Sequence, residues 1–319
     1  MAPKSTSAST ARAASQDASQ DLSVISQDLF HPCTRTWFAE AFANPTRVQL
    51  ESWPALFKQE SALLLAPTGS GKTLAAFLAA IDRLVFAKVG RAEESVSKRG
   101  KSTLRSKSPA AGTEAKTGVK VIYISPLKAL GVDVDRNLRA PLAGISAVAA
   151  REGVTHNAVS VAIRSGDTES RERARMLRHP PDVLITTPES LFLMLTSKAR
   201  EILAGVETVI IDEIHTMVSS KRGAHLFLSL ERLETLRKNQ SADVTSLQRI
   251  GLSATQRPLD EVARLLGGYQ QFGDEGLSSE RTVNIIDASE KRPFELTICM
   301  PLGDQVDQAA DEFNVVGNA

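Results

Sequence analysis

Short apolar runs alternate along the chain with segments in which apolar residues recur at helical spacing. The apolar runs are rich in Val and Ile, nearly continuous, and lie at 63–65, 119–125, 159–163, 182–187, 208–212 and 248–255. Such runs are typical of strands that are covered on both faces. Helical spacing occurs at 74–86, 170–178, 223–238 and 259–266. This alternation predicts an α/β fold with a mostly parallel sheet and helices on both faces.

Long polar blocks lie outside this pattern. Residues 1–28 are mainly Ser, Ala, Gln and Asp, and they contain too little apolar surface to order, so we expect a disordered tail. Residues 90–118 are rich in Lys, Arg, Ser and Gly, which predicts a disordered basic insertion that is solvated rather than bound to phosphate. We expect one folded domain over 29–300 and a linker or tail over 301–319.

Composition narrows the class of protein. The chain has 319 residues and a formal net charge of +1, with 38 Lys and Arg against 37 Asp and Glu. The balanced charge gives the protein no overall positive field that would attract nucleic acid, so any contact with nucleic acid has to be local. Cys33 and Cys299 lie far apart and outside any metal-binding spacing, which argues against a disulfide framework or structural zinc. Because no leader or membrane-span pattern occurs, we expect a cytoplasmic protein with no membrane partner.

The stretch "LLLAPTGSGKT" joins a predicted strand to a predicted helix through a glycine-rich turn. This is the context of a phosphate-binding loop, although Ala66 stands where the pattern G-x-x-x-x-G-K-[ST] has its first glycine. Lys72 would reach the β- and γ-phosphates, and the Thr73 hydroxyl would bind Mg²⁺. The alternative is a plain turn with an incidental lysine. Backbone N–H groups in the loop would surround a polyphosphate, and its predicted contacts are Thr68, Gly69, Ser70, Gly71, Lys72 and Thr73.

The stretch "VIIDEIH" places two adjacent carboxylates at the end of another predicted strand. In a P-loop protein the strand-end Asp212 would help to hold Mg²⁺, and Glu213 would deprotonate the attacking water. A solvated strand end is the alternative for this pair taken alone. His215 follows in the same stretch and lacks partners for a metal site.

The motifs "APTGSGKT", "DEIH" and "SAT", in this order, resemble the first RecA-like domain of a superfamily 2 helicase of the DExH type. Longer blocks are similar to the large helicase-related family of ATP-dependent DNA translocases, namely "PTRVQLESWP", "SPLKALGVDVDRNL", "TTPESLFLML", "DEIHTMVSSKRGAHLFLSLERL" and "LSATQRPLDEVARLLGG". The resemblance covers residues 30–268. It implies a RecA-like fold, ATP and Mg²⁺ as cofactors, single-stranded DNA or RNA as partner, and a role in DNA repair.

The resemblance also assigns roles to residues. Gln49 matches the glutamine that recognises adenine, and Trp37 or Phe38 would either stack on the base or pack in the core. Lys72, Glu213 and His215 form the implied catalytic set. Ser253 and Thr255 match the segment that couples the ATP site to the strand. The loops that touch the nucleic-acid backbone match Pro126, Lys128, Thr187, Pro188 and Glu189. Between them, Arg164 and Gly166 lie in a similar loop, for which a plain turn is the alternative.

A superfamily 2 motor hydrolyses ATP between two RecA-like domains, the second of which supplies arginine fingers. After Gly268 the chain contains no Q-x-x-G-R-x-[GR]-R block of the second domain. We therefore expect a motor half that needs a second RecA-like domain and is weakly active alone. The alternatives are a non-catalytic nucleotide- or nucleic-acid-binding module, or the motor half of an RNA helicase or a restriction-type translocase.

Overall fold

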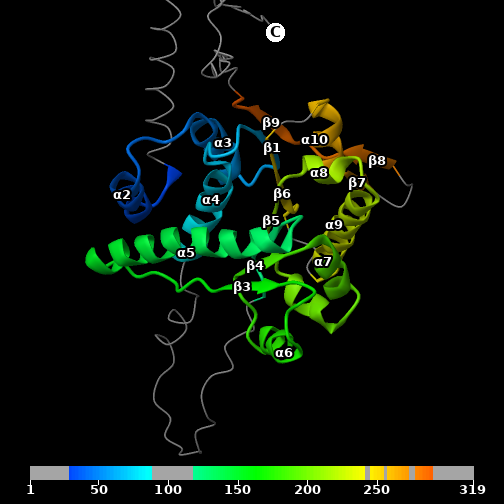
Figure 1. The fold of residues 1–319 in the computed structure, drawn as a ribbon, viewed down its shortest axis with the longest axis horizontal. Coiled ribbons are helices and arrows are strands. Elements are labelled where there is room, and N and C mark those ends of the chain that lie inside the picture. The colour runs from blue at the N-terminus through cyan, green and yellow to red at the C-terminus, as the bar shows by residue number, and fades with distance from the viewer. Residues whose placement is uncertain (1–28, 88–117, 241–244, 255–256, 273–276, 290–319) are drawn as a thin grey trace, which may run out of the picture.

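The computed structural model describes residues 29–87, 118–240, 245–254, 257–272 and 277–289 (Figure 1). The predicted tail, the predicted insertion except its last residue, and the predicted C-terminal tail all lie outside the described residues. So does Thr255. Within the described part, no helix combines the length and the apolar character needed to cross a membrane.

The centre of the fold is a seven-stranded parallel sheet with the order β3-β4-β2-β5-β6-β1-β9. Its strands are β1 (Ala62–Leu65), β2 (Val121–Ile124), β3 (Val161–Arg164), β4 (Val183–Thr186), β5 (Thr208–Ile211), β6 (Gln248–Ser253) and β9 (Asn284–Asp287). The parallel sheet predicted from the Val- and Ile-rich runs is confirmed, and each predicted run overlaps one strand. An antiparallel hairpin of β7 (Tyr269–Phe272) and β8 (Leu277–Glu280) was not predicted.

Helices cover both faces of the sheet, as predicted (Figure 1). One face carries α2 (Pro32–Ala41), α3 (Arg47–Phe57), α4 (Lys72–Phe86) and α5 (Lys128–Arg151). The other carries α7 (Pro188–Leu195), the 3₁₀ helix η1 (Lys198–Leu203), α8 (His215–Val218), α9 (Lys221–Gln240) and α10 (Leu259–Gly267). Helix α6 (Ser170–Arg178) lies between β3 and β4 in sequence.

Successive residues of each inner strand are buried on opposite faces. In β1, Leu64 packs in the core under α4, whereas Leu63 and Leu65 pack in the core under α9 and α10. In β2, Tyr123 packs in the same core as Leu64, and Ile122 packs in the core on the opposite face. Because side chains alternate along a strand and both faces are covered, these strands have to be apolar at nearly every position. This two-layer core fixes the strand ends from which the functional loops project.

Candidate functional site

The predicted site residues lie along one edge of the sheet. Because all seven strands are parallel, their carboxyl ends meet at the same edge, where ligands bind in open α/β sheets. In sheet order from β1, this edge presents the loop 66–71, then Ser253 after β6, then Asp212 after β5. Continuing past β5, it presents the loops that follow β2, β4 and β3. The predicted nucleotide contacts therefore lie on one side of β5, and the predicted strand contacts lie on the other.

The loop between β1 and α4 has the backbone of a phosphate cradle. Gly69 and Gly71 adopt φ values of +80° and +88°, which side-chain-bearing residues rarely tolerate. A Cβ atom added at Gly71 would lie 2.7 Å from Gln49 Nε2, whereas one added at Gly69 would meet no atom within 4 Å. The Ser70 hydroxyl is buried without a hydrogen-bond partner. Helix α4 starts directly after the loop, so its N-terminal N–H groups and its dipole favour an anion here.

Lys72 turns back onto this loop. Its Nζ donates to the carbonyl oxygens of Ala66 and Pro67, and the second of these contacts is 2.9 Å long. Burial lowers the pKa of Lys72, while the carboxylates of Glu213 and Asp212 act in the opposite direction. The Lys72 ammonium therefore interacts electrostatically with the "DEIH" segment, and its predicted role at the phosphates stays a prediction.

Gln49 lies against the same loop. It is 3% exposed, its Oε1 accepts a 2.9 Å hydrogen bond from the Thr46 N–H, and its Nε2 donates to Gly71 O at 3.4 Å. The side chain thus connects the start of α3 to the phosphate loop. Its predicted recognition of adenine stays a prediction.

Asp212 and Glu213 follow β5. Asp212 accepts a hydrogen bond from the Tyr123 hydroxyl, and its other oxygen accepts from the Glu213 N–H at 3.0 Å. Burial, and then the Asp212 carboxylate, raise the pKa of Tyr123 far above its ordinary value, so the phenol keeps the proton that it donates. Glu213 adopts a φ of +45°, an unfavourable conformation for a glutamate of a kind that concentrates at functional sites.

His215 connects the ends of two strands. Its Nδ1 lies 3.2 Å from Glu213 Oε2 and 3.4 Å from Ser253 Oγ. Ser253 is fully buried at the end of β6. The structure thus brings together Glu213, His215 and Ser253, and their predicted catalytic and coupling roles stay predictions. Among the described residues, no group of three or more His, Cys, Asp or Glu could hold a metal ion.

The predicted strand contacts come from three loops on the far side of β5. Thr187 is buried and caps α7, because its hydroxyl accepts a hydrogen bond from the Ser190 N–H at 3.4 Å. The Arg164 guanidinium has a buried Nη1 without a hydrogen-bond partner, and burial followed by the charge of Arg173 lowers its pKa. Arg173 Nη2 donates to Gly166 O at 2.8 Å. Two arginines beside one loop and an unpartnered N–H suit an anion such as a backbone phosphate.

Pro126 and Glu189 are joined by a residue that the motifs did not identify as functional. Arg222 Nη1 donates to Pro126 O at 2.7 Å, and its Nε and Nη2 donate to the two Glu189 oxygens. The Arg222 guanidinium lowers the pKa of Glu189 to about 2. From the sequence alone, Arg222 is equally well explained as part of a solvated basic turn, so only the fold reveals this contact.

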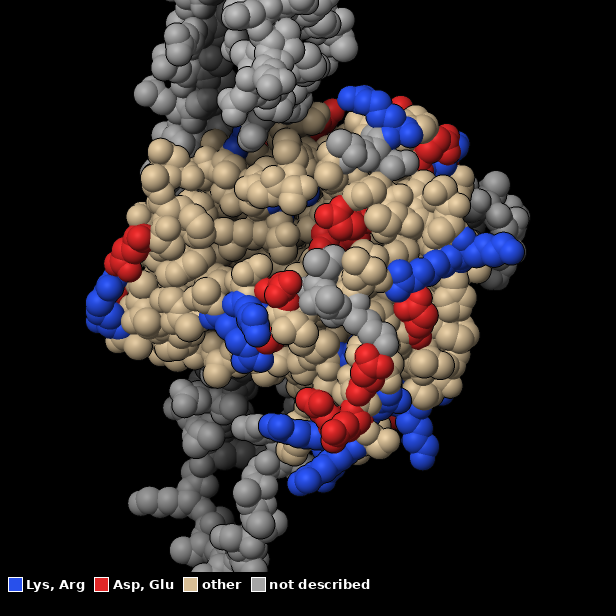
Figure 2. Space-filling model, in the orientation of Figure 1, with Lys and Arg blue, Asp and Glu red and all other residues tan. Residues whose placement is uncertain are grey.

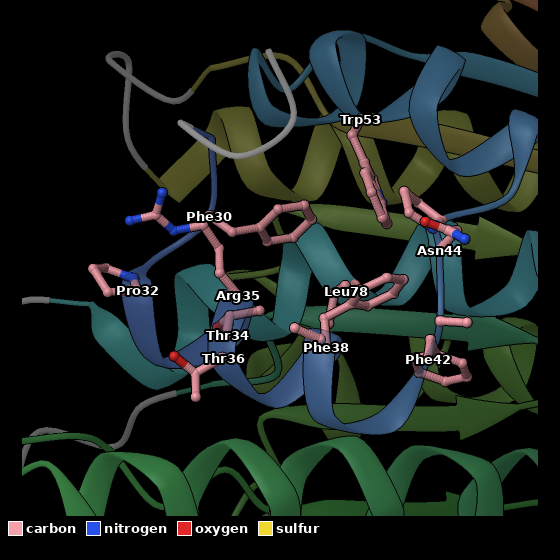
Figure 3. A pocket seen from close by; sticks show the side chains of 13 residues that line it. Phe30, Pro32, Thr34, Arg35, Thr36, Phe38, Phe42, Asn44, Trp53 and Leu78 are labelled. Carbon is pink, nitrogen blue, oxygen red and sulfur yellow. The ribbon is translucent and has the colours of Figure 1, made fainter. Parts of the chain in front are cut away.

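The sequence motifs also did not single out Tyr123 and Phe42. Tyr123 reads as an ordinary core position in an apolar strand, and nothing in its sequence context marks the contact with Asp212. Phe42 is 41% exposed and helps to line a cavity of about 600 Å³ between α2 and α3. Figure 3 shows the rings of Phe30, Phe38 and Phe42 around this cavity. In the sequence, the only sign of this residue was an aromatic side chain four positions before Thr46.

Trp37 lies in the core rather than at the site. It is 9% exposed, and α5 approaches it so closely that a Cβ atom added at Gly144 would lie 2.1 Å from Trp37 Nε1.

Figure 2 shows basic and acidic side chains interspersed on the face in view, without one large basic patch. On this face, the interspersed charges agree with the near-neutral net charge of the chain.

Comparison with known proteins identifies the family of the chain. A family described as DEAD/DEAH box helicase matches residues 46–262. The chain is 47% identical over 287 residues to the Lhr helicase/uracil glycosylase of Escherichia coli, covering 90% of this chain and 16% of that protein. It is 41% identical to the ATP-dependent helicase Lhr-Core of Methanothermobacter thermautotrophicus, covering 91% of this chain and 29% of that protein.

A solved structure resembles the fold as well. The structure of Mycobacterium smegmatis helicase Lhr bound to ssDNA and AMP-PNP matches with a TM-score of 0.66 and 47% identity, over 82% of this chain and 28% of that one. The predicted resemblance to the large helicase-related family and the RecA-like fold are thereby confirmed. The chain spans less than a third of the length of each of these three relatives. Because the family match covers more than half of its residues, the chain belongs to the DEAD/DEAH box helicase family.

Proposed function

We propose that this chain is the first RecA-like half of an ATP-dependent motor that moves along single-stranded DNA. The observation that carries the proposal is the position of Lys72, whose ammonium donates to carbonyl oxygens of the phosphate loop and interacts electrostatically with the carboxylates of Glu213 and Asp212. The M. smegmatis relative supports the choice of ligands, since it is described as bound to ssDNA and AMP-PNP. A second RecA-like domain, supported by the greater length of the relatives, would complete the site.

The residues of the loop fit a nucleoside triphosphate. The unpartnered Ser70 hydroxyl and the open space at Gly69 leave donors and room for phosphate oxygens. Lys72 would exchange its carbonyl contacts for the β- and γ-phosphates. The exposed ring of Phe42 and the amide of Gln49 would receive the base on the side of α3, since an aromatic face and an amide edge suit a purine.

Thr73 and Asp212 are the residues that would hold Mg²⁺. They offer one hydroxyl and one carboxylate, and Mg²⁺ usually takes its other ligands from phosphate and water. Once bound, the ion would neutralise charge on the phosphates. Tyr123 orients Asp212 by donating to one of its oxygens. Glu213 would then accept the proton of the attacking water, and His215 would hold the Glu213 carboxylate in place.

The loops that follow β2, β4 and β3 would contact one strand through its backbone. Arg164 and the loop around Gly166 supply cationic and N–H donors. Pro126 and Thr187 lie in the loops after β2 and β4, and Lys128 and Pro188 are the first residues of the helices α5 and α7 that follow these loops. Contacts of this kind hold a strand without reading its sequence. With a net charge of only +1, we expect moderate affinity that falls as salt concentration rises.

The test is equilibrium binding of a fluorescent AMP-PNP derivative with Mg²⁺ to the 319-residue chain. Lys72→Ala should weaken binding by about 100-fold, because it removes the charge that faces the phosphates. Lys198→Ala is the matched control, since it removes an exposed lysine at the start of η1, and it should bind within about twofold of the parent. Equal binding by the parent and Lys72→Ala would refute the assignment of the loop.

Hydrolysis is tested separately, with and without a single-stranded oligonucleotide. The proposal expects slow turnover by this chain, because arginine fingers from a second domain contribute about 10³ to 10⁵ in rate in related phosphoryl transfers. Fast, strand-stimulated turnover that Glu213→Gln abolishes would show that the chain assembles a complete site without a second domain. That result would overturn the motor-half interpretation and retain the role of Glu213.

A further inference from the structure

Arg222 joins segments that are far apart in the sequence. It is the second residue of α9, and its guanidinium reaches Pro126 in the loop after β2 and Glu189 in the first turn of α7 after β4. These contacts span 96 and 33 positions of sequence respectively. One planar side chain thus ties together two of the three loops that would contact the strand.

The chemistry of the contact requires arginine. Nε, Nη1 and Nη2 each donate a hydrogen bond, so both oxygens of Glu189 and the carbonyl of Pro126 are satisfied at once. A lysine ammonium cannot reproduce this planar fork. Three of the five guanidinium N–H groups are used in these contacts, so Glu189 and Pro126 hold the Arg222 side chain in place. Glu189 is likewise occupied, and its carboxylate would repel a phosphate.

The start of α9 is also fixed to the nucleotide side of the edge. Helix α8 begins at His215, which contacts Glu213, and α9 begins three residues after α8 ends. Gly223 packs so closely against the end of α8 that an added Cβ atom would lie 1.9 Å from Met217 O. The Gly223 N–H donates to Ser220 Oγ at 3.0 Å. These contacts connect the segment after β5 to the start of α9, which carries Arg222.

We propose that Arg222 is a positioning residue that holds the loops at 126–127 and 187–189 in one fixed register and links them to the nucleotide-site segment 212–218. This inference rests on the proposed function for the role of these loops in binding a strand. The contacts by which Arg222 holds the loops do not depend on that function. Glu189 then acts as the anchor for Arg222 rather than as a direct strand contact.

The first test is fluorescence anisotropy of a labelled oligothymidine with the 319-residue chain. Arg222→Ala should bind the oligonucleotide about tenfold more weakly, since small misplacement of contacts is costly, while its affinity for AMP-PNP stays within about twofold of the parent. Arg222→Lys keeps the charge and should still bind weakly. Lys221→Ala removes the exposed neighbouring charge and is the matched control, with a loss of about twofold or less. The double variant Arg222→Ala/Glu189→Ala should bind no worse than Arg222→Ala.

The second test is amide hydrogen exchange without any nucleic acid. Arg222→Ala should speed exchange at the amides of Ser125, Leu127, Thr187 and 189–191 and leave β1 unchanged. Unchanged exchange, oligonucleotide affinity of Arg222→Ala within twofold of the parent, or an equal loss in Lys221→Ala would each overturn the proposal. If instead the parent binds no oligonucleotide while exchange rises as expected, the proposed function fails and the holding role of Arg222 stands.

Discussion

Substitution of Gly71 by alanine tests the geometry of the phosphate loop directly. Gly71 and Gly69 both have positive φ values, of +88° and +80°. They differ in their surroundings, because a new Cβ atom at Gly71 would lie 2.7 Å from Gln49 Nε2, whereas one at Gly69 would meet nothing within 4 Å. Gly69→Ala therefore reports backbone strain alone, and Gly71→Ala reports the same strain plus displacement of Gln49.

The magnitudes follow from these contacts. A left-handed conformation costs an alanine about 1–2 kcal/mol, which is the expected loss in the free energy of unfolding for Gly69→Ala. Displacing Gln49 disturbs its hydrogen bonds to Thr46 N and Gly71 O, each of which contributes about 1 kcal/mol. Gly71→Ala should therefore lose about 2–4 kcal/mol in total.

Urea unfolding monitored by circular dichroism measures these differences, provided that the slopes agree among variants. The same substitution is then made in a Gln49→Ala background, where the obstructing amide is absent. There, Gly71→Ala should cost only what Gly69→Ala costs, which gives a coupling of about 1–2 kcal/mol. Equal losses for Gly69→Ala and Gly71→Ala, or no relief in the Gln49→Ala background, would refute the packing of Gln49 on the loop.

Three further predictions concern the neighbouring strand ends. Glu213 has a φ of +45°, which strains alanine but not glycine. In urea unfolding, Glu213→Gly should therefore be about 1 kcal/mol more stable than Glu213→Ala. Equal stabilities of the two variants would contradict that strain. Ser253→Ala should lower stability by about 1 kcal/mol through loss of the buried contact with His215, and leave AMP-PNP affinity unchanged in a titration. The Glu189 pKa of about 2 lies below its ordinary value, so its ion pair stabilises the fold above about pH 4.5 and is lost as pH falls towards 2. The difference in stability between the parent and Glu189→Gln should stay below about 1 kcal/mol, since the carboxylate is exposed. In urea titrations, this difference should disappear as the pH falls from about 4.5 towards 2.

The sheet could be predicted from the sequence because burial on both faces imposes an apolar residue at nearly every strand position. Other elements carry no such signal. The hairpin strands "YQQF" and "LSSE" are polar and short. Helix α5 contains Pro141, which breaks the local pattern, and tertiary packing of residues such as Leu138 and Ile145 stabilises it nevertheless. Local pattern fails where long-range contacts decide the structure.

The site divides in the same way. The phosphate loop was predictable because its chemistry is written in consecutive residues, from the turn glycines to Lys72. Arg222 and Tyr123 were not, because they act through partners that lie 96 and 89 positions away in sequence. Phe42 falls between these cases, since its position before "PTRVQ" was visible, whereas its exposure required the fold.

The order of the strands predicts how the two halves of the edge communicate. Strand β5 lies between β6 and β2, and its exit segment contacts both neighbours, through His215 to Ser253 and through Asp212 to Tyr123. If this segment responds to nucleotide, AMP-PNP should change oligonucleotide affinity, and the oligonucleotide should change AMP-PNP affinity by the same factor, commonly about 5- to 150-fold. Arg222→Ala should bring both factors close to one, because it disconnects the loops from this segment. Anisotropy titrations with and without saturating AMP-PNP measure the factor. A parent factor that Arg222→Ala leaves intact would show that coupling reaches the strand loops by another path.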